Sequence, residues 1–219
     1  MITVIVVLTL LAILIIWHGW YTEVVTGVPA RKWRVAAGYD NSAEAAERFS
    51  RVHARMMRLF RYLRKKYHID ETLDTVAACE NHAAVVAGQG IRRDMVEKLL
   101  RDYNPDRFYE NDPRVSNNTS YTIGKGDRLY MCLRYRHDPS RLIDEDTLFF
   151  VLLHEAAHIA NFKSWGHDEW FWMVFKWLLG EAQAAGVYEP VDYEKHPVDF
   201  CGLTIYYQPL FDKNLPNIP

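Results

Sequence analysis

The sequence contains few cysteines and none of the glycine-rich or repetitive motifs that mark several protein classes. Its three cysteines are widely spaced and form no CxxC pair, so they indicate reduced thiols of the core in a reducing compartment, not a metal cluster. The chain also has no phosphate-binding glycine loop, internal repeat or low-complexity tract. The missing glycine loop argues against nucleotide hydrolysis.

Charge is unevenly distributed along the 219 residues. The chain has a formal net charge of −2, but residues 1–68 hold 11 Lys and Arg against 4 Asp and Glu, whereas residues 69–219 hold 15 against 24. With 49% hydrophobic and 14% aromatic residues, the composition predicts an ordered chain with a buried core. The length fits one compact domain, with or without a helical arm, and only the N-terminal part is suited to an anionic partner.

One long hydrophobic run opens the sequence. Residues 1–17 contain no charged side chain, and an aromatic belt follows them. This pattern predicts a transmembrane anchor over residues 1–22 in preference to a cleaved signal peptide, because no basic segment precedes the run. Since the basic residues Arg31, Lys32 and Arg34 follow it, the positive-inside rule predicts a single-pass membrane protein with a cytosolic C-terminal domain.

A long amphipathic helix is predicted over Ser42 to Tyr67, where apolar side chains recur at steps of three and four. Its opposite face is a basic stripe formed by Arg48, Arg51, Arg55, Arg58, Arg61 and Arg64. The stripe is either the solvated face of a core-packed helix or a surface that binds membrane lipid, nucleic acid or an acidic protein. The sequence leaves these alternatives open.

A zinc-binding motif lies on a further predicted helix, which begins at Asp144 or Asp146. An apolar run leads into His154-Glu155-Ala156-Ala157-His158, an HExxH sequence. Histidines four residues apart share one helix face, about 6 Å apart along the axis, so both imidazoles can bind one zinc ion. Glu155 can then activate a zinc-bound water as general base, for attack on a peptide carbonyl.

A catalytic zinc needs a third protein ligand and one open position. His167 is the preferred candidate, because residues 163–166 form a turn that can bring the chain back to the metal. Glu181, on the following predicted helix, is the alternative third ligand, and Asp168 is a candidate partner for a ligand histidine. Candidates for stabilising an oxyanion are Tyr193, His196, Tyr206 and Tyr207.

Two family resemblances follow from these motifs. The HExxH sequence together with Gly166-His167-Asp168-x-x-Phe171-Trp172 resembles the SprT and WLM group of zinc peptidases. This resemblance implies a zincin-like fold, zinc held by the three histidines, and Glu155 as general base. The segments 118–122, 132–134 and 197–203 resemble membrane-anchored metallopeptidases of nucleocytoplasmic large DNA viruses, which implies a virion component between an internal membrane and the capsid.

We therefore predict an α+β protein with three parts. These are a transmembrane anchor (1–22), a juxtamembrane segment with the basic amphipathic helix (23–68), and a zincin-like metallopeptidase domain (69–219) whose active-site helix packs on a small sheet. The predicted function is a membrane-anchored zinc-dependent peptidase acting on a protein or peptide. The alternative is a membrane-tethered structural or assembly protein, such as a minor capsid protein in contact with other virion proteins. A nucleic-acid-associated protease is a third hypothesis, which the acidic balance of residues 69–219 disfavours.

Overall fold

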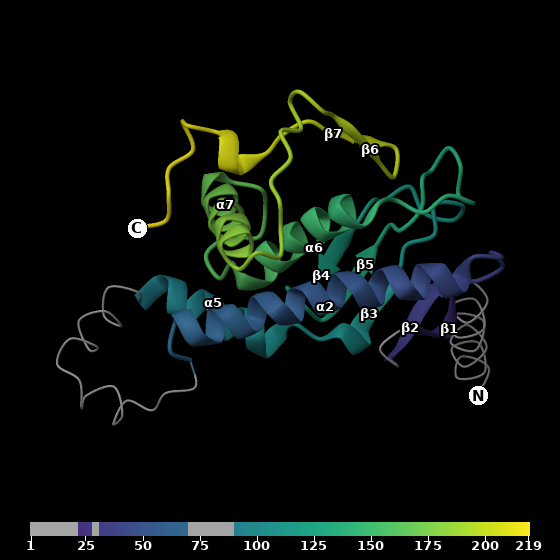
Figure 1. The fold of residues 1–219 in the computed structure, drawn as a ribbon, viewed down its shortest axis with the longest axis horizontal. Coiled ribbons are helices and arrows are strands. Elements are labelled where there is room, and N and C mark those ends of the chain that lie inside the picture. The colour runs from purple at the N-terminus through teal and green to yellow at the C-terminus, as the bar shows by residue number, and fades with distance from the viewer. Residues whose placement is uncertain (1–21, 28–30, 70–89) are drawn as a thin grey trace, which may run out of the picture.

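The computed structural model describes residues 22–27, 31–69 and 90–219 (Figure 1). Its helices are α2 (Ser42–Lys66), α5 (Gly90–Asp102), α6 (Glu145–Ala160) and α7 (Glu169–Ala184), with short 3-10 helices at Pro105–Arg107 and Pro209–Phe211. Its strands are β1 (Thr22–Gly27), β2 (Arg31–Ala36), β3 (Phe108–Glu110), β4 (Tyr121–Ile123), β5 (Arg128–Met131), β6 (Val198–Phe200) and β7 (Leu203–Ile205). The described fold is therefore α+β, as expected.

The main sheet has the strand order β1-β2-β3-β5-β4. Strands β1 and β2 form an antiparallel pair, β3 runs parallel to both β2 and β5, and β4 pairs antiparallel with β5. Strand β4 thus lies at the edge of the sheet. Strands β6 and β7 form a separate antiparallel hairpin.

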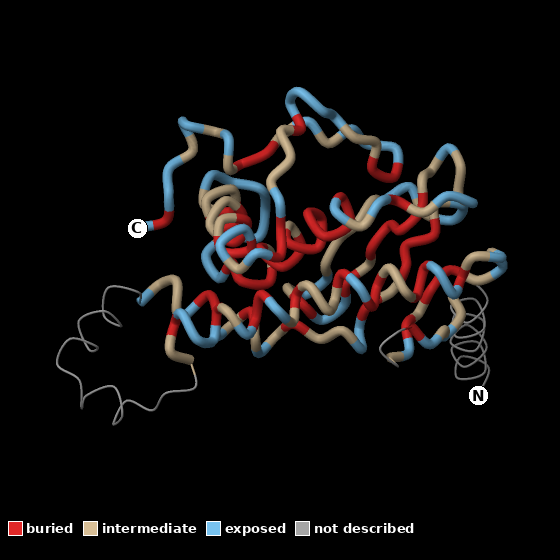
Figure 2. Tube along the Cα trace, in the orientation of Figure 1, coloured by how far each residue is buried: buried red, intermediate tan, exposed pale blue. Residues whose placement is uncertain are grey.

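The core lies where the helices cover one face of this sheet, and buried residues concentrate along α2, α6 and the inner strands (Figure 2). Helix α2 buries one stripe, including Phe49, Val52 and Met56, as its amphipathic pattern predicts. Helix α6 is buried along most of its length, because α2, α5, α7 and β4 all pack against it. In the view of Figure 1, α6 lies between α2 and the β6–β7 hairpin.

The predicted N-terminal transmembrane helix is not supported. Among the described residues, no helix is both long and apolar enough to cross a bilayer. Helix α2 has 25 residues but a charged face, whereas the apolar helices α6 and α7 have 16 residues each, short of the roughly 20 that a span needs. The predicted span lies outside the described residues except for Thr22, which begins β1. The predicted single-pass membrane localisation, and the position between an internal membrane and the capsid that the viral resemblance implied, are therefore not supported.

The interval that the sequence assigns to a juxtamembrane segment contributes two strands to the main sheet. Strands β1 and β2 pair along their whole length, from Thr22 opposite Ala36 to Gly27 opposite Arg31. Trp33 of β2 is buried, and its indole Nε1 donates a hydrogen bond of 2.7 Å to Ser50 Oγ on α2. These strands and α2 share one core with the rest of the fold.

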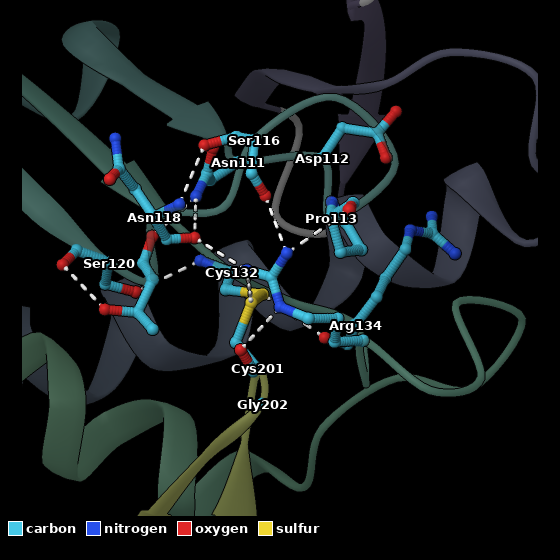
Figure 3. The surroundings of a disulfide bond; sticks show 12 residues. Asn111, Asp112, Pro113, Ser116, Asn118, Ser120, Cys132, Arg134, Cys201 and Gly202 are labelled. Carbon is cyan, nitrogen blue, oxygen red and sulfur yellow. Dashed lines mark hydrogen bonds between the residues drawn. A yellow bond between two sulfur atoms is a disulfide. The ribbon is translucent and has the colours of Figure 1, made fainter.

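Two of the three cysteines form a disulfide, so the prediction of reduced thiols was wrong for them. Cys132, directly after β5, is bonded to Cys201, at the tip of the β6–β7 hairpin, with their Cα atoms 6.1 Å apart. Figure 3 shows the bond between the sheet and the hairpin, beside Ser120 and Asn118. The two residues are 69 positions apart in sequence, and only the tertiary fold brings them together. Cys79 lies outside the described residues.

Candidate metal centre

Helix α6 carries the HExxH motif in its last two turns. The helix starts after Asp144, whose carboxylate caps it by accepting a hydrogen bond of 2.8 Å from the backbone N–H of Thr147. It ends at Ala160, two residues after the second histidine of the motif. Both histidines are partly exposed while the rest of this stretch is buried, so the imidazoles lie at the surface of a fixed helix.

The turn after α6 is held by Asn161, whose side chain is completely buried. Its Oδ1 accepts hydrogen bonds from the backbone N–H groups of Lys163 and Ser164, at 2.9 and 3.1 Å, and its Nδ2 donates to Ser164 Oγ. Lys125, from the turn between β4 and β5, donates to the carbonyl oxygens of Asn161 and Ser164, both at 2.6 Å. These contacts fix the path of the chain that leads to His167.

The structure brings His154, His158 and His167 together. The Nε2 atom of His167 lies 3.0 Å from that of His154 and 3.1 Å from that of His158. In the described part of the chain, these three side chains form a group that could hold a metal ion, with ligand atoms all within 4.8 Å of one another. Two of the nitrogens come from one helix and the third from the turn before α7.

All three imidazoles are held in the neutral form that a metal ligand requires. Burial, followed by the charges of the other two histidines, lowers the pKa of His154 well below its usual value. Burial, then the charges of His167 and Lys125, lowers the pKa of His158 to about 4. Burial also lowers the pKa of His167. At neutral pH their nitrogen lone pairs are therefore available.

Glu155 lies between the two helix histidines in sequence and is 3% exposed. Burial raises the pKa of its carboxyl group to about 8. Its Oε2 atom has no hydrogen-bond partner within the described residues, although such buried groups are normally paired. Part of the side chain nevertheless lines the cleft beside the histidines.

Phe171 of α7 supports all three histidine rings. It is completely buried, stacks on His158 with ring centroids 4.2 Å apart, and meets the rings of His154 and His167 edge-on at 4.9 and 4.7 Å. The sequence places this aromatic residue in the motif but does not reveal that one ring contacts every candidate ligand.

The alternative ligand Glu181 lies elsewhere in the structure. Its carboxylate is buried and accepts hydrogen bonds of 2.7 Å from Lys66 Nζ and from the hydroxyl group of Tyr67. Asp168 caps α7 by accepting from the backbone N–H of Phe171, and it also accepts from Ser164 Oγ. It therefore anchors the turn that carries His167 and makes no hydrogen bond to a ligand histidine among the described contacts.

A cleft runs past the histidines. One depression of about 250 Å³ is lined by β4 residues Tyr121 and Thr122 together with the three histidines, and another of about 260 Å³ lies on the side of the β6–β7 hairpin. The two share Ser120, His154 and Glu155. Strand β5 is internal in the sheet of described strands, and the edge beside the cleft belongs to β4.

Of the four candidates for stabilising an oxyanion, two line the cleft and two do not. Tyr206 and Tyr207 line the depression on the hairpin side, and the hydroxyl group of Tyr207 donates to Asp212 at 2.7 Å. Tyr193 is buried against Phe150. His196 is exposed and lines neither depression within the described structure.

The basic stripe of α2 divides into two halves. Arg48, Arg51 and Arg55 contact the start of α6 or nearby carbonyl groups, for example through Arg51 to Glu145 at 2.8 Å and Arg55 to Asp146 at 2.7 Å. Arg58 and Arg61 are exposed and line a separate depression beside Trp33, and Arg64 is exposed as well. The first half of the stripe thus serves the packing of α2 on α6.

The chain matches no family model. It is similar to uncharacterized proteins of Acanthamoeba polyphaga mimivirus (36% identity over 98 residues, 45% of this chain and 48% of the relative) and of Invertebrate iridescent virus 3 (34% over 91 residues, 42% and 55%). A protein of Invertebrate iridescent virus 6 is 34% identical over 71 residues, 32% of this chain and 39% of the relative. The chain thus spans about half the length of these curated relatives or less. The predicted similarity to virus-encoded proteins is confirmed.

Two solved structures of Wss1 from Saccharomyces cerevisiae, one of them a mutant, also show similarity. Their TM-scores are 0.35 and 0.34, at 15% and 17% sequence identity, and the match covers 46% and 49% of this chain and 81% and 82% of theirs. Matches of this extent do not define a family for the chain.

Proposed function

We propose that this protein is a zinc-dependent hydrolase of peptide bonds. The observation that supports the proposal is the convergence of three Nε2 atoms, 3.0 and 3.1 Å apart in two of the three pairs, beside a buried glutamate with an unpaired oxygen. The same order of residues in the sequence, HExxH followed by a later histidine, supports it independently.

The donor set fits zinc. Zinc–nitrogen bonds of about 2.0–2.1 Å in a tetrahedron place ligand nitrogens roughly 3.3 Å apart, close to the separations in the structure. Three neutral imidazoles leave a fourth position open, which is typical of catalytic and not of structural zinc sites. Bound there by His154, His158 and His167, zinc would supply Lewis acidity toward a carbonyl oxygen and lower the pKa of water.

Glu155 is suited to the proton transfers of the reaction. It is held on a buried helix, lines the cleft, and has one buried oxygen without a hydrogen-bond partner among the described residues. Burial raises the pKa of this carboxyl group to about 8, and a zinc cation bound nearby would favour its ionised form. The carboxylate can then take a proton from the attacking water and deliver it to the leaving amine. Burial excludes competing water from the side chain, which strengthens its electrostatic interactions with a reacting group.

The edge strand β4 is suited to orient an extended peptide. Among the described strands it pairs with β5 on one side only, and Tyr121 and Thr122 line the cleft beside the histidines. Backbone groups of an edge strand can pair with an added strand, which would lay a peptide across the centre. A peptide is therefore the substrate class that we favour.

Metal content and hydrolysis test the proposal. The full-length protein, purified without chelators, should contain about one zinc ion per chain, and His154→Ala and His167→Ala should both lose it. Glu181→Gln, the matched control for the alternative ligand, should retain the metal. Glu155→Gln should keep zinc but lose hydrolysis of an unstructured protein by a factor of about 10² or more. Zinc that persists in His167→Ala, or full activity in Glu155→Gln, would refute the proposal.

A further inference from the structure

The depression beside the β6–β7 hairpin is built as a pocket for a side chain. It measures about 260 Å³ and is lined by residues from three elements. Helix α6 contributes Phe150 and Val151, helix α7 contributes Trp172 and Phe175, and the hairpin contributes Phe200 and Ile205. Apolar pockets somewhat smaller than this one accept a benzene ring, whereas sites for whole drug-sized ligands start at about 300 Å³.

The chemistry of the lining excludes a charged occupant. Among the described residues that line the pocket, only His154 and Glu155 can carry a charge near neutral pH, and both belong to the candidate metal centre. The remaining lining consists of apolar and aromatic side chains with a few hydroxyl groups. Transfer of a charged group into such surroundings is strongly unfavourable, whereas transfer of an apolar group is favourable.

The pocket opens onto the candidate metal centre. His154 and Glu155 form part of its wall and also part of the depression beside β4. Leu203 and Tyr206 also line the pocket, and they are 56% and 71% exposed. A chain lying along the cleft would therefore place a side chain in this pocket and cover these exposed residues.

The wall formed by the hairpin is fixed in place. Cys201 and Gly202 both have positive φ, 54° and 82°, as the tight type I′ hairpin turn requires. The disulfide ties this turn to Cys132, and Arg136 Nε donates a hydrogen bond of 3.0 Å to the carbonyl oxygen of Cys201. Arg136 also donates to the carbonyl oxygens of Ser116 and Asn118. The pocket is thus formed before any substrate binds, which favours selectivity.

We propose that this pocket selects substrates with a large apolar side chain, such as leucine or phenylalanine, next to the bond that is cleaved. The inference rests on the proposed hydrolase function, because it concerns the same cleft. The residues that determine the specificity are Ile205 and Phe200 on the hairpin, facing Val151 and Phe175 on the helices.

A binding experiment without metal tests this pocket separately from catalysis. The full-length protein in chelator is titrated with N-acetyl-leucine amide and with N-acetyl-alanine amide, followed by nuclear magnetic resonance chemical shifts. We expect the leucine compound to bind at least about tenfold more tightly, since it buries three more carbon atoms. The variant Ile205→Trp, which fills the pocket, should abolish the difference, whereas Val24→Trp, on an exposed position of β1, should preserve it. Equal affinities, or a difference that survives Ile205→Trp, would overturn the inference.

A second variant at the same position tests the pocket even if Ile205→Trp fails to fold. Ile205→Ala enlarges the pocket, so the preference should move from the leucine to the phenylalanine compound by about tenfold. An unchanged order would also contradict the inference. If the zinc-loaded protein hydrolyses peptides, a series that differs only beside the cleaved bond should show the same order in kcat/KM. Selective binding without hydrolysis would refute only the proposed function, and hydrolysis without selectivity would refute only the pocket.

Discussion

At the scale of single residues, the metal centre depends on side chains that never contact the metal position. Asn161 is the main example, since its amide group forms three hydrogen bonds within the turn that leads to His167. Histidine ligands on α6 are fixed by the helix, whereas the third ligand is oriented by this turn and by the rings of Phe171 and Trp172. Groups that orient ligands typically change metal affinity by about 10–100-fold.

We expect Asn161→Ala to weaken zinc binding by about 10–100-fold without changing the α6 histidines. Competition with a chromogenic chelator measures the affinity. Asn161→Asp, which keeps an acceptor for the two backbone N–H groups but loses the donor to Ser164, should fall between the alanine variant and the wild type. An alanine variant with wild-type affinity would show that the Asn161 side chain is not needed to place His167.

His53 of α2 is a second residue whose surroundings set its protonation state. Its Nδ1 lies 3.1 Å from the hydroxyl group of Tyr103, and its ring packs edge-on against Trp33. Burial, assisted by the charge of Arg31, lowers its pKa from 6.5 to about 4. The folded state therefore binds fewer protons than the unfolded state between these values, and stability falls as the pH decreases through this interval.

The contribution of His53 is fully present above pH 6.5 and is lost as the pH falls toward 4. Between pH 7 and pH 5 it amounts to about 2 kcal/mol. The variant His53→Gln, which cannot ionise, should lose about that much less stability over the same interval. Urea unfolding of both proteins at the two pH values measures how much stability each one loses. The contributions of other titratable groups cancel when the two losses are compared. The same pH dependence in both proteins would show that His53 is protonated in the fold.

At the scale of elements, helix α2 shows how much of a basic stripe is structural. Arg55 is only 12% exposed in its side chain. It donates to the carbonyl oxygen of Val187 at 2.9 and 3.0 Å, pairs with Asp146, and lies 4.2 Å from the ring centre of Phe149. Arg58, one turn further along, is exposed and makes no hydrogen bond or ion pair to the described residues.

Arg55→Ala should therefore lower the free energy of unfolding by about 1–3 kcal/mol, because it removes charged hydrogen bonds and leaves a buried carbonyl unpaired. Arg58→Ala should change it by less than about 0.5 kcal/mol. Chemical denaturation of both variants is the measurement. Equal effects would mean that the contacts of Arg55 contribute nothing beyond those of an exposed arginine.

The β6–β7 hairpin depends on the disulfide between Cys132 and Cys201. The bond closes a loop over a sequence separation of 69 residues, and for a loop of this size the chain-entropy model gives about 4 kcal/mol, with about 2–4 kcal/mol typical in practice. We expect reductant to destabilise the wild-type protein by that amount. The double variant Cys132→Ala, Cys201→Ala should not respond to reductant. An identical midpoint of unfolding for wild type with and without reductant would contradict this expectation.

At the same scale, the sequence predicts some elements well and misses others for physical reasons. The long helix from Ser42 carries a strong periodic signal, and the α6 motif helix carries an apolar run with the capping residue Asp144. Both appear close to their expected bounds. Strands β1 and β2 were missed, although Lys32, Trp33, Arg34 and Val35 alternate in polarity, because the preceding apolar run favours a membrane interpretation. The three-residue strands β3, β6 and β7 are too short for any periodic signal.

Some residues of the candidate site can be found from the sequence, and others need the fold. The histidines and Glu155 can be chosen from spacing, because a helix fixes the geometry between positions four residues apart. The choice of His167 over Glu181 needs the fold, since Lys66 and Tyr67, far away in sequence, occupy the carboxylate of Glu181. The role of Lys125, the disulfide and the hairpin wall of the pocket also need the fold, because each depends on contacts between segments that are distant in sequence.

At the scale of the whole molecule, a bound metal would add a direct link between α6 and the turn before α7. His154 and His158 lie on α6, whereas His167 lies in the turn before α7. A ligand that binds only the folded state adds RT ln(1 + [L]/Kd) to the free energy of unfolding, about 2.7 kcal/mol when its free concentration is 100 times Kd. For a chain of this size that corresponds to a rise in Tm of about 5–10 °C.

Zinc should therefore raise the Tm of the wild-type protein by about 5–10 °C over the value in chelator, as measured by scanning calorimetry. His154→Ala and His167→Ala should show no such rise, because each removes one of the three converging nitrogens. Glu181→Gln should start from a lower Tm, since it disturbs a buried hydrogen-bonded cluster, yet gain the same increment from zinc. An equal increment in wild type and His154→Ala would mean that zinc binds elsewhere on the chain, and the three-histidine centre would have to be abandoned.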